Sequence, residues 1–202
     1  MNEVVLEAKS KQEALLKVMK ALNANEEEII YNITEEKGSL FKSTTYRIKA
    51  TTLVNCVELI KKFLSQVITN LGIDVNFESN IRDKAININI YIDKSGLLIG
   101  KNGETLRALE ILAKQKINQE YNCFIKLNLD IENYKLKRIE NLERLAKKTA
   151  REVRSSKVEA TLENMNSFER RIIHNVLTDF KGIKTLSEGE EPNRHVIIKP
   201  TD

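Results

Sequence analysis

The sequence predicts an α+β protein composed of several small units. Short apolar runs with a period of two, typical of strands, alternate with longer runs whose apolar residues recur every three or four positions, typical of helices. No Gly-Ser-rich or Pro-rich linker separates these runs, so we expect the units to pack closely or to share helices.

Composition places the chain among globular proteins. Its 202 residues are 41% hydrophobic and 31% charged, and no apolar run approaches the roughly 18 residues of a membrane span. The N-terminal stretch "MNEVVLEAKSKQ" carries charges where a signal peptide has its apolar core. We therefore expect a cytoplasmic protein.

Cysteine and histidine usage predicts no metal site. Cys56 and Cys123 are far apart in apolar surroundings, which favours reduced core residues. His174 and His195 are the only histidines, so a zinc site would have to recruit all four residues from separate regions. No metal or other cofactor is expected.

Residues 1–50 read as a small βαββ unit. A strand "EVVLEA" precedes Ser10 and Glu13, whose spacing is that of a capping box, and an apolar stripe follows at Ala14, Leu15, Val18, Met19 and Leu22. The segments "EIIYNITEE" and "STTYRIKAT" read as strands around the turn "EKGSLF". This unit contains no catalytic constellation.

Residues 51–130 predict the element order α-β-β-α-α-β. Thr51 or Thr52 can cap a helix that Gly72 ends, and strands follow at 73–79 and 85–93. The second strand alternates strictly, so its isoleucines at 86, 88, 90 and 92 should face the core. After a short helix and a glycine pair, a helix continues to about Tyr121 and a strand closes the unit at 123–131.

The glycine pair Gly100 and Gly103 encloses Lys101 and Asn102 between two predicted helices. A P-loop needs four residues between its glycines and Ser or Thr after the lysine, whereas three residues separate Gly96 from Gly100 and Asn102 follows the lysine. A dinucleotide fingerprint also fails, because there is no correctly placed third glycine and no parallel βαβ unit. Taken alone, the pair fits a helix–helix turn.

In its context the stretch "LLIGKNGETLRALEILA" resembles the GXXG region of a type II KH domain covering residues 51–130. The resemblance implies that Gly100, Lys101, Asn102 and Gly103 meet a nucleic-acid backbone, and that Ile99 and Leu106 line the apolar groove for bases. Glycine lets backbone amides approach phosphate, and the following helix directs the positive end of its dipole the same way. Related loops often carry a second basic residue where Asn102 stands, which predicts weaker phosphate attraction here.

A basic helix is predicted to connect the KH-like unit to the C-terminal unit over residues 131–154. Its apolar residues Ile131, Tyr134, Ile139, Leu142, Leu145, Ala146 and Val153 should face inward. The segment from Lys135 to Lys157 holds nine Lys or Arg against three Glu. Such a run is typical either of a solvated helix face or of contact with a polyanion.

Residues 155–202 contain Arg170 and His174 one helical turn apart, on a helix from about 167 to 179 capped by Asn166 with Glu169. By themselves, an Arg and a His on a helix are more often surface residues or a histidine satisfied in the core than a functional site. With the residues that follow, they resemble the single-stranded nucleic-acid-binding domain named R-three-H; those residues are Thr185, Ser187, Gly189, Asn193 and Arg194. The resemblance implies that Arg170 and His174 contact phosphate or bases, with Arg194 nearby.

A small N-terminal unit, a KH domain and an R-three-H domain in this order resemble the bacterial Jag family, also called KhpB or EloR. "EEKGSLFK" is similar to that family's N-terminal turn but departs at Ser39 and Phe41. The resemblance implies a cytoplasmic RNA-binding protein with a small KH-only, KhpA-like partner. It also implies links to cell elongation, cell-wall synthesis and a YidC-type membrane insertase.

Three functions remain open. The first is non-enzymatic binding of single-stranded RNA, with single-stranded DNA as the competing ligand. The second is a protein-interaction adaptor in which the KH unit serves mainly for dimerisation, giving a homo-oligomer, and the N-terminal unit recruits a membrane-insertase or cell-wall partner. The 5% aromatic content and the lack of Trp keep it open because base stacking needs rings. The third is a nuclease using Glu190, Glu191 and His195. Salt separates the first two, since phosphate contacts weaken steeply with ionic strength.

Overall fold

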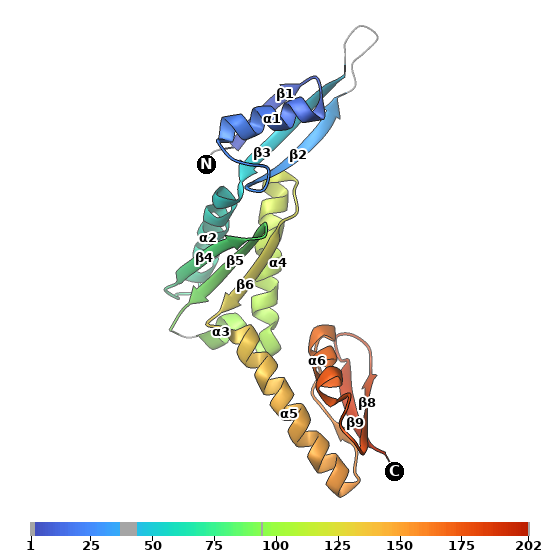
Figure 1. Ribbon diagram of the computed structural model, residues 1–202. Helices are drawn as coiled ribbons and strands as arrows, with labels where there is room; N and C mark the ends of the chain where they lie inside the picture. Colours follow the sequence, from blue (N-terminus) through green and yellow to red (C-terminus); the bar gives the residue numbers. More distant parts are fainter. Residues whose placement is uncertain (1–2, 37–43, 94, 202) are drawn as a thin grey trace. The chain divides into compact units, whose positions relative to one another are not determined.

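The computed structural model describes residues 3–36, 44–93 and 95–201. The chain divides into two compact units, Met1–Glu132 and Asn133–Asp202, each with its own helices and sheets (Figure 1). Together they form a mixed α+β fold, as the sequence predicts. Among the described residues, no helix combines the length and the apolar character needed to cross a membrane.

The first unit begins with a three-stranded antiparallel sheet covered on one face by a helix. The elements are β1 (Glu3–Ala8), α1 (Lys11–Leu22), β2 (Ile29–Glu36) and β3 (Thr45–Thr52), in the strand order β1-β3-β2. The Ser10 side chain accepts the N–H of Glu13, which confirms the predicted helix start. Buried side chains between α1 and the sheet include Ala14, Val18 and Ile48. The turn expected at residues 37–42 lies outside the described residues.

The predicted α-β-β-α-α-β order follows directly and is confirmed. The elements are α2 (Leu53–Thr69), β4 (Asn76–Arg82), β5 (Ala85–Tyr91), α3 (Ser95–Ile99), the 3-10 turn η1 (Lys101–Gly103), α4 (Glu104–Tyr121) and β6 (Lys126–Ile131). The sheet has the order β4-β5-β6, with β5 antiparallel to β4 and parallel to β6. All four isoleucines of the alternating run are buried, as predicted. The opposite face of the sheet is polar. There the side-chain amide of Asn87 donates to Asn80 Oδ1, and that of Asn128 donates to Asn87 Oδ1.

Short contacts join the N-terminal sheet to this second part without a linker. β3 runs directly into α2, and the Leu53 N–H donates to the Glu28 carbonyl at 2.8 Å. The Asn32 side chain donates to the Asn122 carbonyl at 3.0 Å. Both cysteines are free and buried, and burial raises the pKa of the Cys56 thiol to about 12. They therefore behave as the inert core residues that the sequence predicts.

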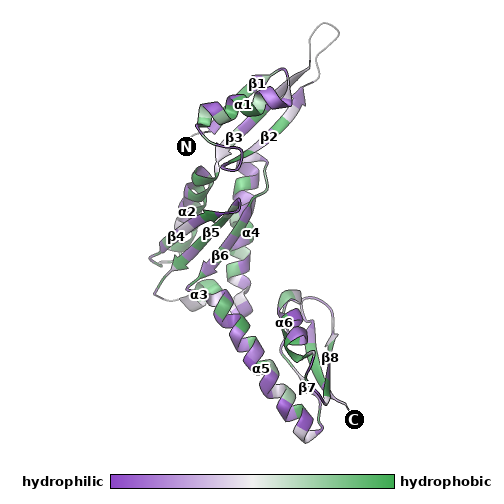
Figure 2. Cartoon of the chain, in the orientation of Figure 1, coloured by the Kyte–Doolittle hydropathy of each residue, from purple (hydrophilic) through white to green (hydrophobic). Residues whose placement is uncertain are grey.

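The second unit packs two helices with a three-stranded antiparallel sheet. Its elements are α5 (Tyr134–Ser156), β7 (Ala160–Thr161), α6 (Ser167–Leu177), β8 (Ile183–Glu188) and β9 (His195–Pro200), with the strand order β7-β9-β8. Asn166 and Glu169 form the predicted capping box at the start of α6. Figure 2 shows alternating hydrophilic and hydrophobic bands along α5, as expected of an amphipathic helix.

The helix expected as a connector contributes to the core of this unit. Its buried Leu142, Ala146, Ala150 and Val153 pack with residues of α6, β8 and β9. Two details differ from the expected inward face: Ile131 belongs to β6, and Leu145 is exposed at the margin of the buried stripe. An apolar stripe at helical spacing shows that a helix is amphipathic, but the stripe does not show which core will bury it.

Candidate nucleic-acid interface

The loop at residues 100–103 has a backbone that only these residue types adopt easily. Gly100 has φ 72° and ψ −179°, a region that is essentially restricted to glycine. A Cβ at Gly100 would also collide with the Thr105 side chain. Gly103 has φ 79° and forms the N-cap of α4. Both glycines are therefore required by conformation, and Gly100 by space as well.

Asn102 has φ 51° and ψ 26°, the left-handed conformation. Asparagine tolerates this conformation better than lysine or arginine, because its short side chain can bond locally to the backbone. The residue that departs from the related loops thus fits the local backbone. Sequence reasoning missed this demand, although an Asn before a Gly is a known signal for positive φ.

The loop leads into an 18-residue helix whose N-terminus has no side-chain cap, because glycine occupies the N-cap. The Glu104 N–H donates to the Lys101 carbonyl, and no side chain caps the turn. The helix dipole favours an anion at this end. The side chains of Lys101 and Arg107 are exposed here. Glu104 lies in the same first turn and offsets part of that positive field. The loop can therefore position a phosphate with backbone groups and attract it with a modest charge.

The two apolar residues expected to line a groove for bases lie at different depths. Ile99 is half-buried at the end of α3, whereas Leu106 is only 2% exposed and supports the loop from the core. Leu97 of α3 is 62% exposed, and its neighbour Leu98 is buried. Leu97 and Ile99 are thus the apolar side chains that α3 offers to a ligand. The sequence did not single out Leu97, because the run "LLI" gives no signal for which residue faces out.

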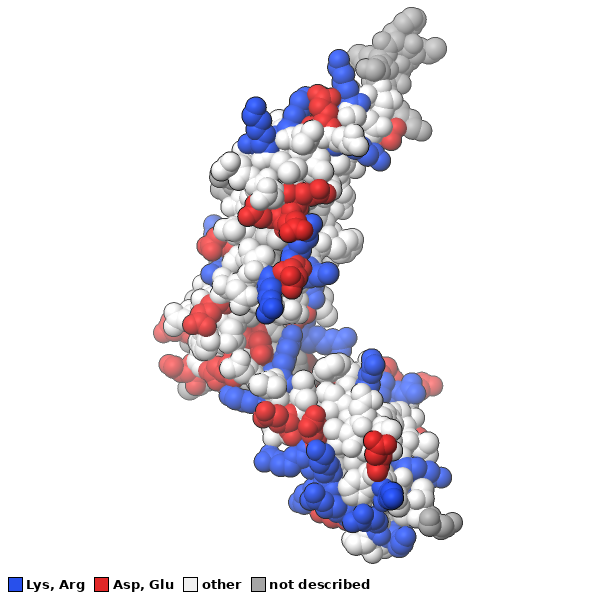
Figure 3. Space-filling model, viewed as in Figure 1, with Lys and Arg blue, Asp and Glu red and all other residues white. Residues whose placement is uncertain are grey.

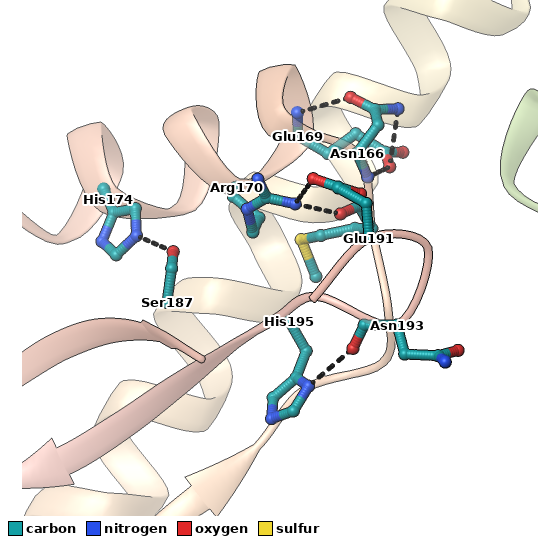
Figure 4. Close-up of polar contacts among 9 residues, drawn as sticks. Asn166, Glu169, Arg170, His174, Ser187, Glu191, Asn193 and His195 are labelled. Atoms are coloured by element: carbon teal, nitrogen blue, oxygen red, sulfur yellow. Dashed lines mark hydrogen bonds and ion pairs between the residues drawn. The ribbon is translucent and has the colours of Figure 1, made fainter. Parts of the chain in front are cut away.

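Arg170 of α6 is buried, with 7% of its surface exposed. Its Nη1 donates to the Met165 carbonyl at 2.8 Å and pairs with Glu191 Oε1 at 2.9 Å (Figure 4). The carboxylate of Glu191 comes from the loop between β8 and β9 and is itself largely exposed. Arg170 therefore holds this loop against the start of α6.

The neighbouring Glu169 is also buried and charged. It closes the capping box with Asn166, and the Arg138 Nε of α5 donates to its Oε1 at 2.7 Å. Buried charges are tolerated when they are paired and hydrogen-bonded, and both Glu169 and Arg170 meet this condition. The start of α6 is thus tied to α5 on one side and to the β8–β9 loop on the other.

His174 lies one turn after Arg170 and contacts β8. Its Nδ1 lies 2.6 Å from Thr185 Oγ1 and its Nε2 lies 2.7 Å from Ser187 Oγ. Thr185 and Ser187 are two residues apart on a strand, so they share the face that α6 covers. Burial, and then the charge of Arg170, lower the pKa of His174. The ring is therefore neutral at pH 7, with one nitrogen donating and the other accepting.

The loop that carries Arg194 is held by backbone bonds. Gly189 has φ 85°, and a Cβ there would lie 3.1 Å from the Asn193 carbonyl oxygen. The Asn193 N–H donates to the Glu190 carbonyl at 2.7 Å, and the Met165 N–H donates to the Arg194 carbonyl at 3.1 Å. The Arg194 side chain is exposed. The structure thus brings Arg194 to the same loop as Glu191, the partner of Arg170.

Sequence reasoning did not find Glu191 or Met165 as partners of Arg170. Glu191 lies 21 positions along the chain, and no local spacing rule reaches that far. The residues suggested for a nuclease do not converge. Glu191 points to Arg170, while His195 Nδ1 lies 3.0 Å from the Asn193 carbonyl oxygen (Figure 4).

Comparison with known protein families agrees with the division of the chain into two units. Residues 57–131 match the KhpA/KhpB KH domain, and residues 140–200 match the R-three-H domain. Both families are binding domains and not catalytic ones.

Two similar proteins match over almost the whole chain, and a third matches over 70% of it. "RNA-binding protein KhpB" of Clostridium symbiosum is 37% identical over 98% of this chain and 91% of its own length. The protein of the same name from Bacillus subtilis is 32% identical over 98% of each chain. That from Lactiplantibacillus plantarum is 34% identical over 70% of this chain and 44% of its own length. This chain therefore belongs to the KhpB (Jag) family.

Proposed function

We propose that this chain is a non-enzymatic protein that binds single-stranded RNA through the residue 100–103 loop and through the Arg170, His174 and Arg194 region. The observation that carries the proposal is the loop conformation, which leaves the N-terminus of α4 without a side-chain cap. The name of the relatives, RNA-binding protein, supports the choice of RNA. Single-stranded DNA is the competing ligand, because phosphate contacts do not distinguish the two.

At the first site the backbone amides and Lys101 would meet phosphate, while the exposed apolar surface of α3 would meet bases. Gly100 and Gly103 leave room for the strand, and Asn102 keeps the turn without strain. Ile99 would line the groove, and Leu106 would support it from beneath. This division of roles is that of the GXXG loop in KH domains.

At the second site a phosphate would reach Arg170 only by taking the place of Glu191. The ion pair uses a single guanidinium nitrogen, and the carboxylate is largely exposed, so exchange requires little disruption of the core. A phosphate could then accept two N–H groups of the planar guanidinium, which is a stronger contact. His174 would act by holding β8 with its two hydroxyl contacts, and Arg194 by its exposed charge.

In the cell, we infer that the chain acts in the cytoplasm after transcription and regulates cell elongation and cell-wall synthesis. Resemblance to the Jag family supports this role. The same KH family description covers KhpA and KhpB, which supports pairing with a small KH-only, KhpA-like protein. A contact with a YidC-type insertase rests on the family resemblance alone.

An adaptor is the second candidate function, and one observation favours it. Ile111 and Leu112 of α4 are 56% and 51% exposed and lie on the outward face of the helix, beside Ala108. An apolar helix face of this kind suits a protein partner or a second copy of the chain. In this case the KH unit would serve assembly more than RNA binding.

Fluorescence anisotropy with labelled single-stranded RNA at several salt concentrations tests the proposal. We expect the Lys101→Asp, Asn102→Asp double variant to bind more weakly, because it places two negative charges where phosphate would lie. Aspartate tolerates the left-handed backbone at position 102, so the loop itself should persist. The Arg170→Ala, His174→Ala variant should weaken binding further when combined with it.

Unchanged RNA affinity in the combined variant would falsify the proposal. Binding that is insensitive to salt would instead favour the adaptor, since an apolar interface does not release counterions. Circular dichroism of each variant shows whether any loss of binding reflects loss of the fold.

A further inference from the structure

The outward face of α5 is strongly basic over its C-terminal half. Between residues 144 and 157 the chain has six basic residues and one acidic residue, Glu152. The basic residues, all of them exposed, are Arg144, Lys147, Lys148, Arg151, Arg154 and Lys157. Figure 3 shows Lys and Arg side chains gathered over this half of the helix.

Three of these basic residues point directly away from the core. The buried stripe of α5 runs through Leu142, Ala146, Ala150 and Val153. The series 144, 148 and 151 is offset from that stripe by two residues, which is about 200° around the helix. The basic face is therefore separate from the inward side of the unit, where Arg170 and His174 make their contacts.

Ordinary structural roles account for only part of these charges. Arg154 lies over the ring of Phe180 at 5.2 Å. The helix dipole favours cations in the last turn, but this effect does not extend to Lys147 or Lys148. Lys148 lies 3.9 Å from Glu152 in an exposed pair. Within the described part of the chain, no ion pair involves Lys147 or Arg151.

We propose that this face of α5, residues 144–157, is a third RNA surface that binds the phosphodiester backbone without reading sequence. It rests on the proposed function and adds a site that is independent of both motif regions. At the rise of an α-helix, the six charges extend over roughly 20 Å, so they can contact several consecutive phosphates. Arginines at three of the six positions suit phosphate, because the guanidinium can donate two parallel bonds.

An anionic lipid surface is less well matched to this face. Helices that lie on membranes insert an apolar face beside their basic one. The apolar face of α5 is instead buried in the core of the unit. Charge complementarity without apolar insertion is the requirement of a nucleic-acid backbone.

The test neutralises the three central residues together as Lys147→Gln, Lys148→Gln and Arg151→Gln. These side chains are exposed, so the fold should persist, which thermal unfolding checks. The matched control neutralises three exposed lysines of the first unit: Lys9→Gln, Lys20→Gln and Lys62→Gln. Both variants change the net charge equally. Affinities for oligo-A, oligo-U and oligo-C RNA are measured across a salt series.

We expect the α5 variant to lose on the order of tenfold in affinity at low salt, equally for all three oligomers. Its slope of log K against log salt should fall by about 2, at roughly 0.7 for each lost single-strand contact. The control should change far less. Equal losses in the two variants, or a loss confined to one oligomer, would overturn the inference.

Binding to phospholipid vesicles tests the other candidate partner, an anionic lipid surface. If the α5 variant loses binding to vesicles containing anionic phospholipid but keeps its affinity for RNA, the face is a membrane surface and the inference is wrong. If the wild-type chain binds no RNA, the proposed function fails first and the inference fails with it. If the wild type binds RNA and the α5 variant binds it equally well, the inference is wrong but the proposed function stands.

Discussion

The loop at residues 100–103 and the Arg170–His174 face of α6 present their polar groups in opposite ways. The loop holds a backbone that favours glycine, with Lys101 exposed and the helix N-terminus uncapped. In the C-terminal unit, Arg170 pairs with Glu191 and both nitrogens of His174 meet hydroxyl groups. A preformed loop can receive a phosphate directly, whereas a paired arginine must first release its partner.

This difference suggests that the two regions respond to mutation in different ways. Changes in the loop should act on binding through backbone geometry. Changes at Arg170 or His174 should act on stability and binding together, because these side chains also support the unit.

The largest effect is expected for Gly100→Ala. Alanine would have to adopt a positive φ and would collide with Thr105, at a cost of about 1–3 kcal/mol in the loop conformation. The loop should rearrange, and RNA affinity should fall tenfold or more, which corresponds to about 1.4 kcal/mol. Anisotropy measures the affinity, and thermal unfolding measures the stability.

Gly96→Ala is the matched control. Gly96 lies within α3, and nothing lies within 4 Å of the position that an alanine methyl group would take, so alanine should be neutral or slightly stabilising there. If both substitutions left RNA binding intact, the preformed backbone would not be the basis of the first site.

A smaller effect, with opposite signs for binding and stability, is expected for Glu191→Gln. Arg170 would keep its hydrogen bond to the Met165 carbonyl but lose its ion pair with Glu191. The free energy of unfolding should therefore fall by about 1 kcal/mol. RNA affinity should rise about threefold to tenfold, because phosphate no longer competes with a carboxylate for Arg170. Chemical denaturation and anisotropy give the two quantities.

Glu190→Gln removes the same charge one residue away, on an exposed side chain of the same loop. Its effect on RNA affinity measures the general electrostatic contribution. An equal gain in the two variants would mean that Glu191 acts by charge alone. A lower affinity in Glu191→Gln would mean that the ion pair orders the loop for binding and is not displaced.

Local signals explain how much of the fold could be predicted. Ser10 with Glu13 and Asn166 with Glu169 act over three positions, so both helix starts are readable from the sequence. The alternating isoleucines of β5 likewise identify their own buried face. In each case the residues that fix the structure are neighbours along the chain.

The features that escaped prediction depend on tertiary contacts. The stripe of α5 did not reveal that Leu142 and Val153 belong to the core of the C-terminal unit. The pairing of Arg170 with Glu191 joins a helix to a distant loop. Leu106 carries the helical spacing of both a groove residue and a core residue, and only packing shows that it is buried.

The smallest effect concerns the pH dependence of stability at His174. Its pKa is lowered below the ordinary value of 6.5 by burial and by Arg170, so the unfolded chain binds a proton more readily than the folded chain. Stability is therefore full above pH 6.5 and falls as the pH drops through 6.5 toward the lowered folded pKa. His174→Gln keeps polar atoms facing Thr185 and Ser187 but cannot take up this proton.

Chemical denaturation gives the free energy of unfolding of the two proteins at each pH between 5 and 8. Plotted against pH, the two curves should differ most in slope below pH 6.5, where only the wild type loses stability through this group. The two proteins differ only at this side chain, so the difference between the curves isolates the imidazole. Parallel curves would show that His174 is protonated as easily in the folded chain as in the unfolded one. The hydroxyl contacts would then accommodate the imidazolium as well as water does, and the C-terminal site would gain this positive charge below pH 6.5.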